Sequence, residues 1–393
     1  MGAKGRHRTA GESLMGQAVA FRTARWDVVR MRHVVWGRWG VAGVLAALAI
    51  VVVTGWPAGL PSAGATAAGV YASPTPVPTG GPELVYVANT QGPVTAYLAG
   101  STGSVPPVRQ LAAPGAPNTY WGPWGIAFDT RGNAYAQSFL SNATTFVYPP
   151  GATTPSRIFR VAGPDSRAVA IDSAGYAYVA TGQAEAMIAV AAPGASGVAA
   201  NLYTVPAVRQ IPTDESFHPW PGVLTTDTSG HVIAAVVRSI GNAVEFFNGG
   251  PSGGATPVRV IAGPHTGLGT CSSTCDQVAV AYSAFTGRLY VAVSQGQQTH
   301  INVYAGTASG DAAPVRVISG PSTGLAGKVI TGIAGSQVDG TIYVLTKAAA
   351  FNSPGSILAF DRLADGDTPP RRVFTDGGTA LRDGMGIALS TVR

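Results

Sequence analysis

The chain has few charged residues and very few cysteines. Asp, Glu, Lys and Arg make up 11% of its 393 residues, whereas about a quarter is usual for soluble domains. Two cysteines are too few for a disulfide-rich scaffold, and a single C-x₃-C pair does not match a structural zinc site. The sequence also lacks HExxH and GxxxxGK[ST], so neither of these common catalytic motifs is present to assign a reaction.

The positive charge is unevenly distributed along the chain. Residues 1–38 contain eight basic and two acidic residues, whereas residues 39–393 contain 17 of each. A domain that binds nucleic acid through its phosphates needs a basic surface of its own. The balanced charge beyond residue 38 therefore gives no reason to expect nucleic acid as a partner.

One long apolar run follows the basic stretch. Residues 39–56 contain 18 residues without a charge, which is close to the minimum length of a transmembrane helix. Because the positive charges precede it, residues 1–38 are expected in the cytoplasm and the rest of this single-pass protein outside. The alternative is a signal peptide that starts at Met31 and is cleaved near Ala65, so that the protein is secreted. Both interpretations place the remainder of the chain outside the cytoplasm.

The segment after the apolar run predicts a spacer. Residues 57–82 are rich in Pro, Ala, Gly and Thr, with six prolines and no hydrophobic period. Such a composition favours an extended linker that would hold the globular part away from a membrane. The two cysteines, Cys271 and Cys275, lie far beyond it. Outside the cytoplasm we expect them to form a local disulfide that makes one loop more rigid.

An internal repeat with a period of about 50 residues organises residues 83–393, and periods of this length indicate a propeller or a solenoid. In each copy a proline is followed two or three positions later by an arginine, and then by apolar side chains. The six copies are Pro107-Val108-Arg109-Gln110-Leu111, Pro155-Ser156-Arg157-Ile158-Phe159, Pro206-Ala207-Val208-Arg209-Gln210-Ile211, Pro257-Val258-Arg259-Val260-Ile261, Pro314-Val315-Arg316-Val317-Ile318 and Pro370-Arg371-Arg372-Val373-Phe374.

Each repeat predicts four short strands separated by turns. An apolar first strand leads to a turn and to a second strand that often contains Tyr; a third apolar strand follows, and the Pro-Arg strand is the fourth. The globular part starts with a second strand, 84–88, and finishes with a lone first strand, so these two are expected to share one sheet and remove its open edge. The expected first strands are 125–129, 168–172, 223–227, 278–282, 331–335 and 386–389.

The Gly-Ile-Ala-x-Asp sequence with a following Gly and Tyr, clearest from Gly125 to Tyr135, resembles the NHL-repeat propeller proteins of bacteria. The resemblance covers residues 83–393 and implies an all-β, six-bladed β-propeller around a central channel. We expect its ring to be closed by pairing of the N- and C-terminal strands, and one transmembrane or signal helix to precede it.

Regularly spaced charged residues are expected to be structural. Asp129, Asp172 and Asp227 end first strands and precede turns that contain glycine, so their side chains should cap those turns. The repeated arginines should lie along apolar surface, with their guanidinium groups reaching solvent or a neighbouring blade.

Two links between a fourth strand and the next first strand are rich in aromatic residues, and in an up-and-down blade both lie at the same end of the propeller. Aromatic side chains on loops of a rigid scaffold favour a binding surface. The alternative is that these rings plug the mouth of the channel. The candidate binding residues are Tyr120, Trp121, Trp124, Phe217, His218 and Trp220.

The sequence therefore predicts a membrane-tethered, extracytoplasmic sensor or scaffold that binds a protein, a glycan or a small molecule. We expect a binding protein rather than an enzyme, without a metal or other cofactor. One alternative is a metal-dependent hydrolase or lyase of the lactonase-like propeller type. A three-histidine metal site, as in propeller lyases that use zinc, would consist of His218, His265 and His300. Those histidines come from separate links and have no local ligand spacing. A structural component of the cell envelope is the other alternative.

Overall fold

The computed structural model describes most of residues 82–391, all within one structural unit, Ala67–Arg393. The predictions for residues 1–38, 39–56 and 57–81 lie outside the described residues. Within the described part, the only helix is the short η1 (Pro321–Thr323), and no helix there has the length and apolar character needed to cross a bilayer. The described residues are 82–112, 122–139, 143–163, 166–181, 187–206, 224–237, 241–270, 278–295, 298–348, 353–377, 381 and 383–391.

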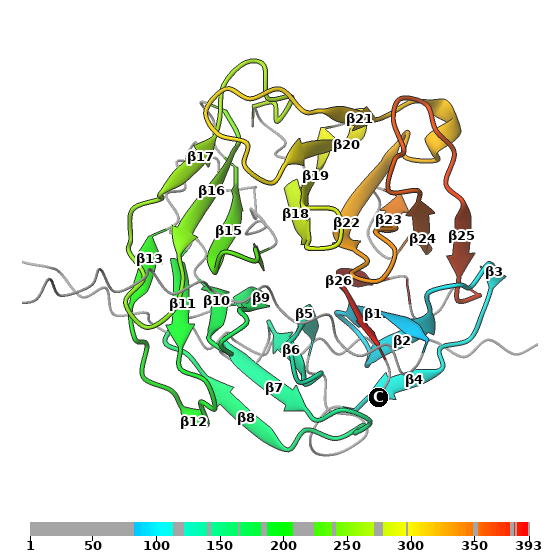
Figure 1. The fold of residues 1–393 in the computed structure, drawn as a ribbon. Coiled ribbons are helices and arrows are strands. Elements are labelled where there is room, and N and C mark those ends of the chain that lie inside the picture. Colours follow the sequence, from blue (N-terminus) through cyan, green and yellow to red (C-terminus); the bar gives the residue numbers. More distant parts are fainter. Residues whose placement is uncertain are drawn as a thin grey trace, which may run out of the picture. The chain divides into compact units, whose positions relative to one another are not determined.

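The described residues form an all-β six-bladed propeller, as the repeat predicts (Figure 1). From the axis outward, the first blade contains β26 (Gly384–Thr391), β1 (Glu83–Asn89), β2 (Val94–Leu98) and β4 (Arg109–Leu111). The second contains β5 (Pro123–Phe128), β6 (Ala134–Ser138), β7 (Thr144–Tyr148) and β8 (Arg157–Arg160). The third contains β9 (Ser166–Ile171), β10 (Ala177–Thr181), β11 (Met187–Ala191) and β13 (Thr204–Pro206).

The other three blades have the same order of strands. The fourth contains β14 (Leu224–Thr226), β15 (His231–Val236), β16 (Ala243–Asn248) and β17 (Arg259–Ile261). The fifth contains β18 (Val278–Ser283), β19 (Arg288–Gln295), β20 (Gln298–Ala305) and β21 (Arg316–Ile318). The sixth contains β22 (Lys328–Gly335), β23 (Ile342–Ala348), β24 (Gly355–Phe360) and β25 (Arg372–Thr375).

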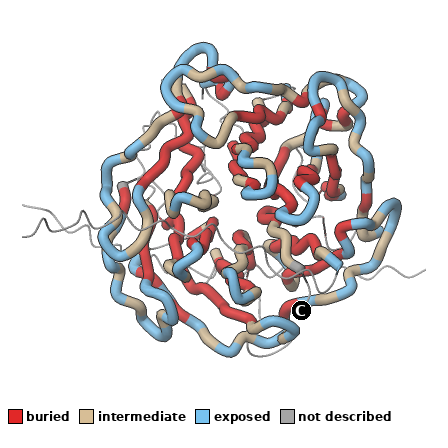
Figure 2. Tube along the Cα trace, viewed as in Figure 1, coloured by how far each residue is buried: buried red, intermediate tan, exposed pale blue. Residues whose placement is uncertain are grey.

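The hydrophobic cores lie between blades. Along β1, Leu84 and Tyr86 pack against the second blade, whereas Val85 and Val87 pack against the sixth. Successive side chains of a strand point to opposite faces, so a strand that is covered on both faces needs apolar residues at nearly every position. This explains the continuous apolar runs in the sequence. Figure 2 shows the same pattern, with burial concentrated on the inner and middle strands and exposure on the outer connections.

The six inner strands contact one another in the order β26, β5, β9, β14, β18 and β22, and β22 contacts β26 again. The glycine of the Gly-Ile-Ala sequence allows this close approach. A Cβ on Gly386 would lie 2.5 Å from the carbonyl oxygen of Trp124, and one on Gly125 would lie 3.1 Å from the Cα of Ala168. The repeated glycine therefore sets the distance between neighbouring inner strands.

The last strand of the chain pairs with the first one. β26 is antiparallel to β1, with a register that runs from Glu83 opposite Thr391 to Asn89 opposite Gly384. In Figure 1 the two strands lie side by side although they come from opposite ends of the sequence. The first blade thus draws its innermost strand from the C-terminal end of the chain.

Short parallel contacts join four of the described outer strands to the next blade. β12 (Gly197–Val198) of the third blade pairs with β8, and β3 (Gly103–Ser104) of the first blade pairs with β25. Isolated bridges join Gly310 to Ile261 and Gly366 to Ile318 in the same way. These contacts cover the outer edges, where unpaired backbone groups would otherwise invite another strand.

The repeated arginines strengthen the same junctions. Arg157 donates a hydrogen bond to the carbonyl oxygen of Ala195 (2.8 Å), and Arg316 donates one to that of Arg362 (2.7 Å). Arg259 donates to Gly306 at 2.6 Å. Each acceptor belongs to the following blade, so the prediction that these groups reach a neighbouring blade is confirmed for these three.

One predicted fourth strand differs in its position. We expected the third Pro-Arg strand at 206–211, but β13 ends at Pro206, which pairs with Met187. The rest of the expected strand, residues 207–211 with Arg209 among them, lies outside the described residues. β13 is an outer strand, and a proline is tolerated there because its missing N–H can face away from the partner strand.

The three aspartates cap turns, as the sequence predicts. Asp129 Oδ1 accepts hydrogen bonds from the backbone N–H groups of Arg131 (3.0 Å) and Asn133 (2.9 Å). Asp172 and Asp227 accept the equivalent pairs of backbone bonds in their own turns. These acids hold the turns between first and second strands.

Candidate functional site

A central channel runs along the inner strands of all six blades. Its cavity volume is about 280 Å³, and residues of β5, β9, β14, β18, β22 and β26 line it. Each of these strands is the edge of its own sheet, so on one side its backbone N–H and C=O groups have no partner strand. The channel is thus lined by small apolar side chains and by unpaired strand edges.

The described lining carries one charged side chain. Arg167 of β9 lines the channel, whereas the other polar side chains in this lining are neutral: Thr225, Thr226, Tyr282 and Gln337. Across the described residues, no three His, Cys, Asp or Glu side chains gather in a way that could hold a metal ion. Arg167 is therefore the one charged side chain that the described lining contributes to the channel.

Arg167 belongs to a cluster at the end of the channel where the inner strands begin. The rings of Trp124 and Phe139 are stacked, with centroids 4.5 Å apart and an interplanar angle of 24°. The Cζ atom of Arg167 lies 5.2 Å from the Trp124 centroid and 5.1 Å from the Phe139 centroid. Both distances are within the range of cation–π attraction. We call Trp124, Phe139 and Arg167 the mouth cluster.

Trp124 is the one predicted binding residue within the described part of the chain. The other five, Tyr120, Trp121, Phe217, His218 and Trp220, lie outside the described residues, as do Cys271 and Cys275. Phe139 and Arg167 were not singled out from the sequence. Phe139 directly follows a second strand and Arg167 lies at the start of a first strand, and both positions face the predicted aromatic end. That topological position is the signal that would have identified them.

Two of the proposed metal-binding histidines have other partners. His265 Nδ1 lies 2.6 Å from Asp311 Oδ2, and this hydrogen bond lowers the pKa of the exposed Asp311 carboxyl. His300 Nε2 lies 3.0 Å from the carbonyl oxygen of Gly267. The third histidine, His218, lies outside the described residues. His265 thus joins its loop to the one that contains Asp311, and His300 joins strand β20 to the loop that contains Gly267.

At the opposite end of the channel, two neutral side chains of the described lining form hydrogen bonds across blades. Thr226 Oγ1 donates to the carbonyl oxygen of Ile171 (3.1 Å), which joins the fourth blade to the third. Gln337 Nε2 donates to the carbonyl oxygen of Tyr282 (3.3 Å), which joins the sixth blade to the fifth. The two ends of the described lining therefore differ, because its one charged side chain, Arg167, lies at the end with the mouth cluster.

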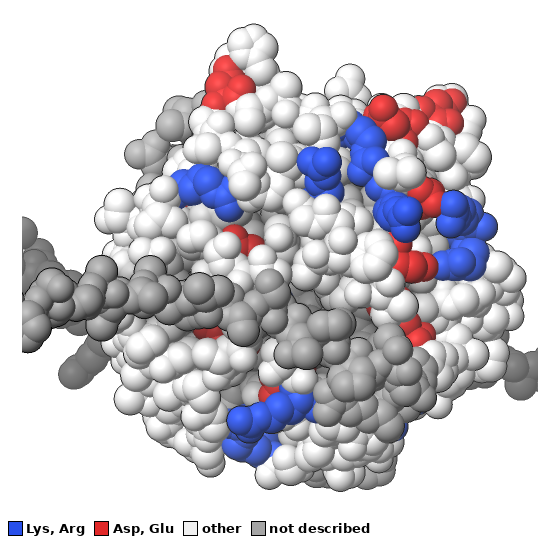
Figure 3. Space-filling model, viewed as in Figure 1, with Lys and Arg blue, Asp and Glu red and all other residues white. Residues whose placement is uncertain are grey.

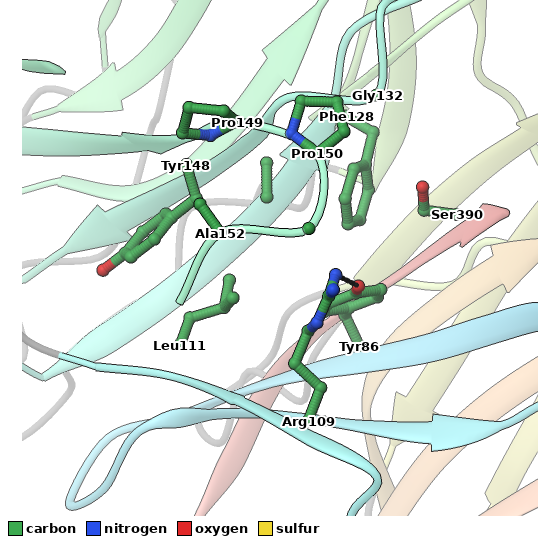
Figure 4. Close-up of a pocket in the computed structure, with 12 residues that line it drawn as sticks. Tyr86, Arg109, Leu111, Phe128, Gly132, Tyr148, Pro149, Pro150, Ala152 and Ser390 are labelled. Atoms are coloured by element: carbon green, nitrogen blue, oxygen red, sulfur yellow. Dashed lines mark hydrogen bonds between the residues drawn. The ribbon is translucent and has the colours of Figure 1, made fainter. Parts of the chain in front are cut away.

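A second cavity, between the first two blades, is too small for an organic ligand (Figure 4). It has a volume of about 20 Å³ and lies beside Arg109 and the turn from Pro149 to Ala152. Arg109 Nη1 donates to the Tyr86 hydroxyl at 3.2 Å, and in Figure 4 its guanidinium points toward this turn. A volume of this size accommodates about one water molecule. It is a gap in the packing between blades.

A third cavity, of about 240 Å³, lies on the sixth blade among charged side chains. Asp361 forms an ion pair with Arg371, and Asp339 and Arg362 also line the cavity. Figure 3 shows acidic and basic side chains interspersed over β21 to β25. Exposed ion pairs are typical of a solvated surface and contribute little to the free energy of unfolding.

Glu83, at the junction of the first and sixth blades, has an unusual ionisation. Ser336 Oγ of the sixth blade donates a hydrogen bond to Glu83 Oε1 at 3.1 Å. The pKa of Glu83 is raised to about 7, because burial and the negative charge of Asp339 outweigh the Ser336 hydrogen bond and the charge of Arg372, which lower it. The protonated form of Glu83 is thus favoured in the folded protein up to neutral pH.

Glu83→Gln is expected to remove a pH dependence of stability. The folded state holds this proton more tightly than the unfolded chain, so the free energy of unfolding should fall as pH rises from about 4.5 to about 7. We expect the wild type to lose about 2 to 3 kcal/mol more than the variant between these pH values. Urea unfolding at pH 5 and pH 8 measures the difference. Parallel pH profiles would contradict this assignment; Asp365→Asn, on an exposed loop, is the control.

Comparison with known proteins supports the fold alone. No family model matches the sequence, and no curated protein matches it. A protein of unknown function from Bacteroides caccae is similar in structure, with a TM-score of 0.52 and 11% identity over 78% of this chain and 98% of that one. Hydrazine synthase of Kuenenia stuttgartiensis has a TM-score of 0.44 and 11% identity, over 67% of this chain and 66% of that one. Together with the geometry, the first similarity supports a β-propeller without assigning its family.

Proposed function

We propose that the protein is an extracytoplasmic binding module, tethered to a membrane, that holds its ligand or partner at the end of the channel with the mouth cluster. A propeller in general suits a binding or scaffold role, because its rigid blades present loops and a channel at fixed positions. The observation that carries the proposal is the stacked Trp124–Phe139 pair beside Arg167 at the opening of the channel.

The finer parts of the proposal rest on the sequence. Residues 39–56 would provide the membrane anchor, with residues 57–82 as the spacer. The relationship to NHL-repeat proteins rests on the Gly-Ile-Ala sequences, whose glycines occupy equivalent places between inner strands. We also propose that the pairing of β26 with β1 closes the ring and so makes the mouth a rigid platform.

Trp124→Ala is expected to weaken capture of the partner at least tenfold, because large aromatic side chains dominate binding energy at protein surfaces. The measurement is affinity capture from a cell-envelope extract by the full chain. The matched control is Phe285→Ala, since Phe285 is an exposed aromatic residue, 49% accessible, in a turn at the other end of the blades.

Equal capture by the Trp124 and Phe285 variants would overturn the proposal. A large fall in melting temperature for Trp124→Ala alone would instead indicate that the ring supports the packing between blades. Metal analysis of the purified protein tests the hydrolase or lyase alternative in the same experiment.

A further inference from the structure

We infer that Glu83 is a proton-controlled latch between the first and sixth blades. The neutral carboxyl holds the start of β1 against the sixth blade, and the ionised carboxyl releases it together with the end of β26. The inference goes beyond the proposed function, because it concerns where the propeller opens and not what it binds.

Glu83 lies where the two ends of the propeller meet. It is the first residue of β1 and lies opposite Thr391, the last residue of β26. Alternate residues of a strand share one face, so Glu83 follows the same face as Val85 and Val87, which are fully buried against the sixth blade. The Glu83 side chain thus extends an apolar face, which explains why it is partly buried.

Ser336 holds the carboxyl from the sixth blade. Its hydroxyl has a single proton, which it donates to Glu83 Oε1 at 3.1 Å. The same hydroxyl accepts hydrogen bonds from the backbone N–H groups of Val338 (3.0 Å) and Asp339 (3.2 Å). This contact therefore fixes the start of β1 to the turn between β22 and β23.

The turn that holds Glu83 also carries a second acid. Burial raises the pKa of Asp339, but hydrogen bonds from Thr341 and Ser336 outweigh burial and lower it, so Asp339 is ionised at neutral pH. Burial and the negative charge of Asp339 both raise the pKa of Glu83. Loss of the Glu83 proton would therefore place two negative charges at one partly buried junction, which is unfavourable.

The one described cation that acts on Glu83 has another partner. Arg372 of β25 lowers the pKa of Glu83, but it forms no described ion pair with this carboxyl, and its Nη2 donates to the Tyr343 hydroxyl at 3.0 Å. That hydroxyl donates in turn to the carbonyl oxygen of Ala99 (3.0 Å). The strands that flank β1, β2 and β26, contain no charged residue. An ionised Glu83 is therefore relieved most readily by moving into water.

The packing of β26 shows how far such an opening would extend. Residues 388–390 are only partly buried, whereas residues 384–387 of the same strand are buried. On β1, every described residue after Glu83 is buried. Local openings involve the least buried parts of a fold, so we expect the first residues of β1 and the last residues of β26 to separate while the rest stays folded.

The test is hydrogen exchange of the full chain by mass spectrometry at pH 6 and pH 8, corrected for the intrinsic exchange rates. Peptides that contain residues 83–85 or 388–391 should lose about tenfold in protection at pH 8. The closed state binds the Glu83 proton with a pKa of about 7, whereas the open state has the ordinary value of 4.5, so rising pH favours opening.

Urea separates a local opening from global unfolding. Exchange at the latch should not respond to urea up to about 1 M, because a local opening exposes little surface. Exchange from β16 in the fourth blade should become faster, because its buried amides need global unfolding. Equal urea dependence at the latch and in β16 would overturn the inference.

Variants identify the group that titrates. Glu83→Gln keeps the Oε1 acceptor for Ser336 but cannot ionise, so its latch peptides should show the same protection at pH 6 and pH 8. Asp339→Asn removes the neighbouring charge and should make the pH response smaller than in the wild type. Asp365→Asn, on an exposed loop of the same blade, is the matched control and should respond as the wild type does.

A wild-type pH response in Glu83→Gln would refute the latch, as would unchanged protection of the wild type between pH 6 and pH 8. Glu83→Gln that is as protected at pH 6 as the wild type shows that the variant folds and that the neutral side chain is sufficient to keep the latch closed.

Discussion

Gly386→Val is expected to unfold the propeller at ordinary temperatures. A Cβ at this position would lie 2.5 Å from the carbonyl oxygen of Trp124 and 3.2 Å from the Cα of Gly125. Both atoms belong to the backbone of the neighbouring inner strand, so neither can move without displacing the second blade. We expect the free energy of unfolding to fall by more than about 4 kcal/mol, which circular dichroism during thermal unfolding will measure.

Gly100→Val is the matched control. A Cβ on Gly100 would meet no atom within 4 Å, and its backbone does not require glycine. We expect this variant to change stability by less than about 0.5 kcal/mol, as surface substitutions usually do. If both valine variants melt at the wild-type temperature, the inner strands are not held at the distance that the structure gives.

Removal of residues 384–393 is expected to abolish cooperative folding. The deletion removes β26, the innermost strand of the first blade, and with it the contacts of β26 to β22 and β5. It also exposes the edge of β1, and a free strand edge is a site for association between chains. We expect soluble aggregates in size-exclusion chromatography and no sharp thermal transition.

The control for this truncation is deletion of residues 392 and 393, which follow β26 and should not change unfolding. A synthetic peptide of residues 384–393 should restore a sharp transition to the shortened chain, because it supplies the missing strand. A shortened chain that stays monomeric and melts as the full chain does would show that pairing of β26 with β1 does not close the ring.

Much of the fold could be predicted from local sequence. Short apolar segments separated by Gly, Pro and Asp indicate strands and turns directly, and the repeated proline marks each unit. The capping of turns by Asp129, Asp172 and Asp227 also follows from neighbours within four residues. The membrane anchor, the disulfide and the remaining aromatic residues stay predictions.

Contacts between blades were harder to predict, because they join residues far apart in the sequence. Asp311 accepts a hydrogen bond from the backbone N–H of His265, and Asp367 accepts one from that of Ser322. The sequence does contain a signal for these contacts: Gly263–Leu268 and Gly320–Leu325 both match G-P-x-T-G-L. Each first glycine has a positive φ and lies against the aspartate of the next blade.

The mouth cluster was also hard to predict, because its residues come from separate parts of the sequence. Trp124 was identified from an aromatic segment, but Phe139 and Arg167 meet it only because three strands of two blades converge. A lone arginine before a strand carries no signal by itself. Its importance appears only when the blades are arranged around the channel.

The placement of the cores between blades has a consequence for how this fold can change. Each hydrophobic core lies between two neighbouring blades, so every blade contributes one face to each of two cores and has no core of its own. A single blade taken out of the protein would therefore expose two apolar faces. Deleting a blade from the propeller would bring its two neighbours into contact through faces that are not complementary in shape. A ring also has one interface more than an open row of the same blades, and it has no end blades that need protection. The repeat can consequently vary residue by residue, as its degenerate sequence shows, while the number of its copies stays constrained.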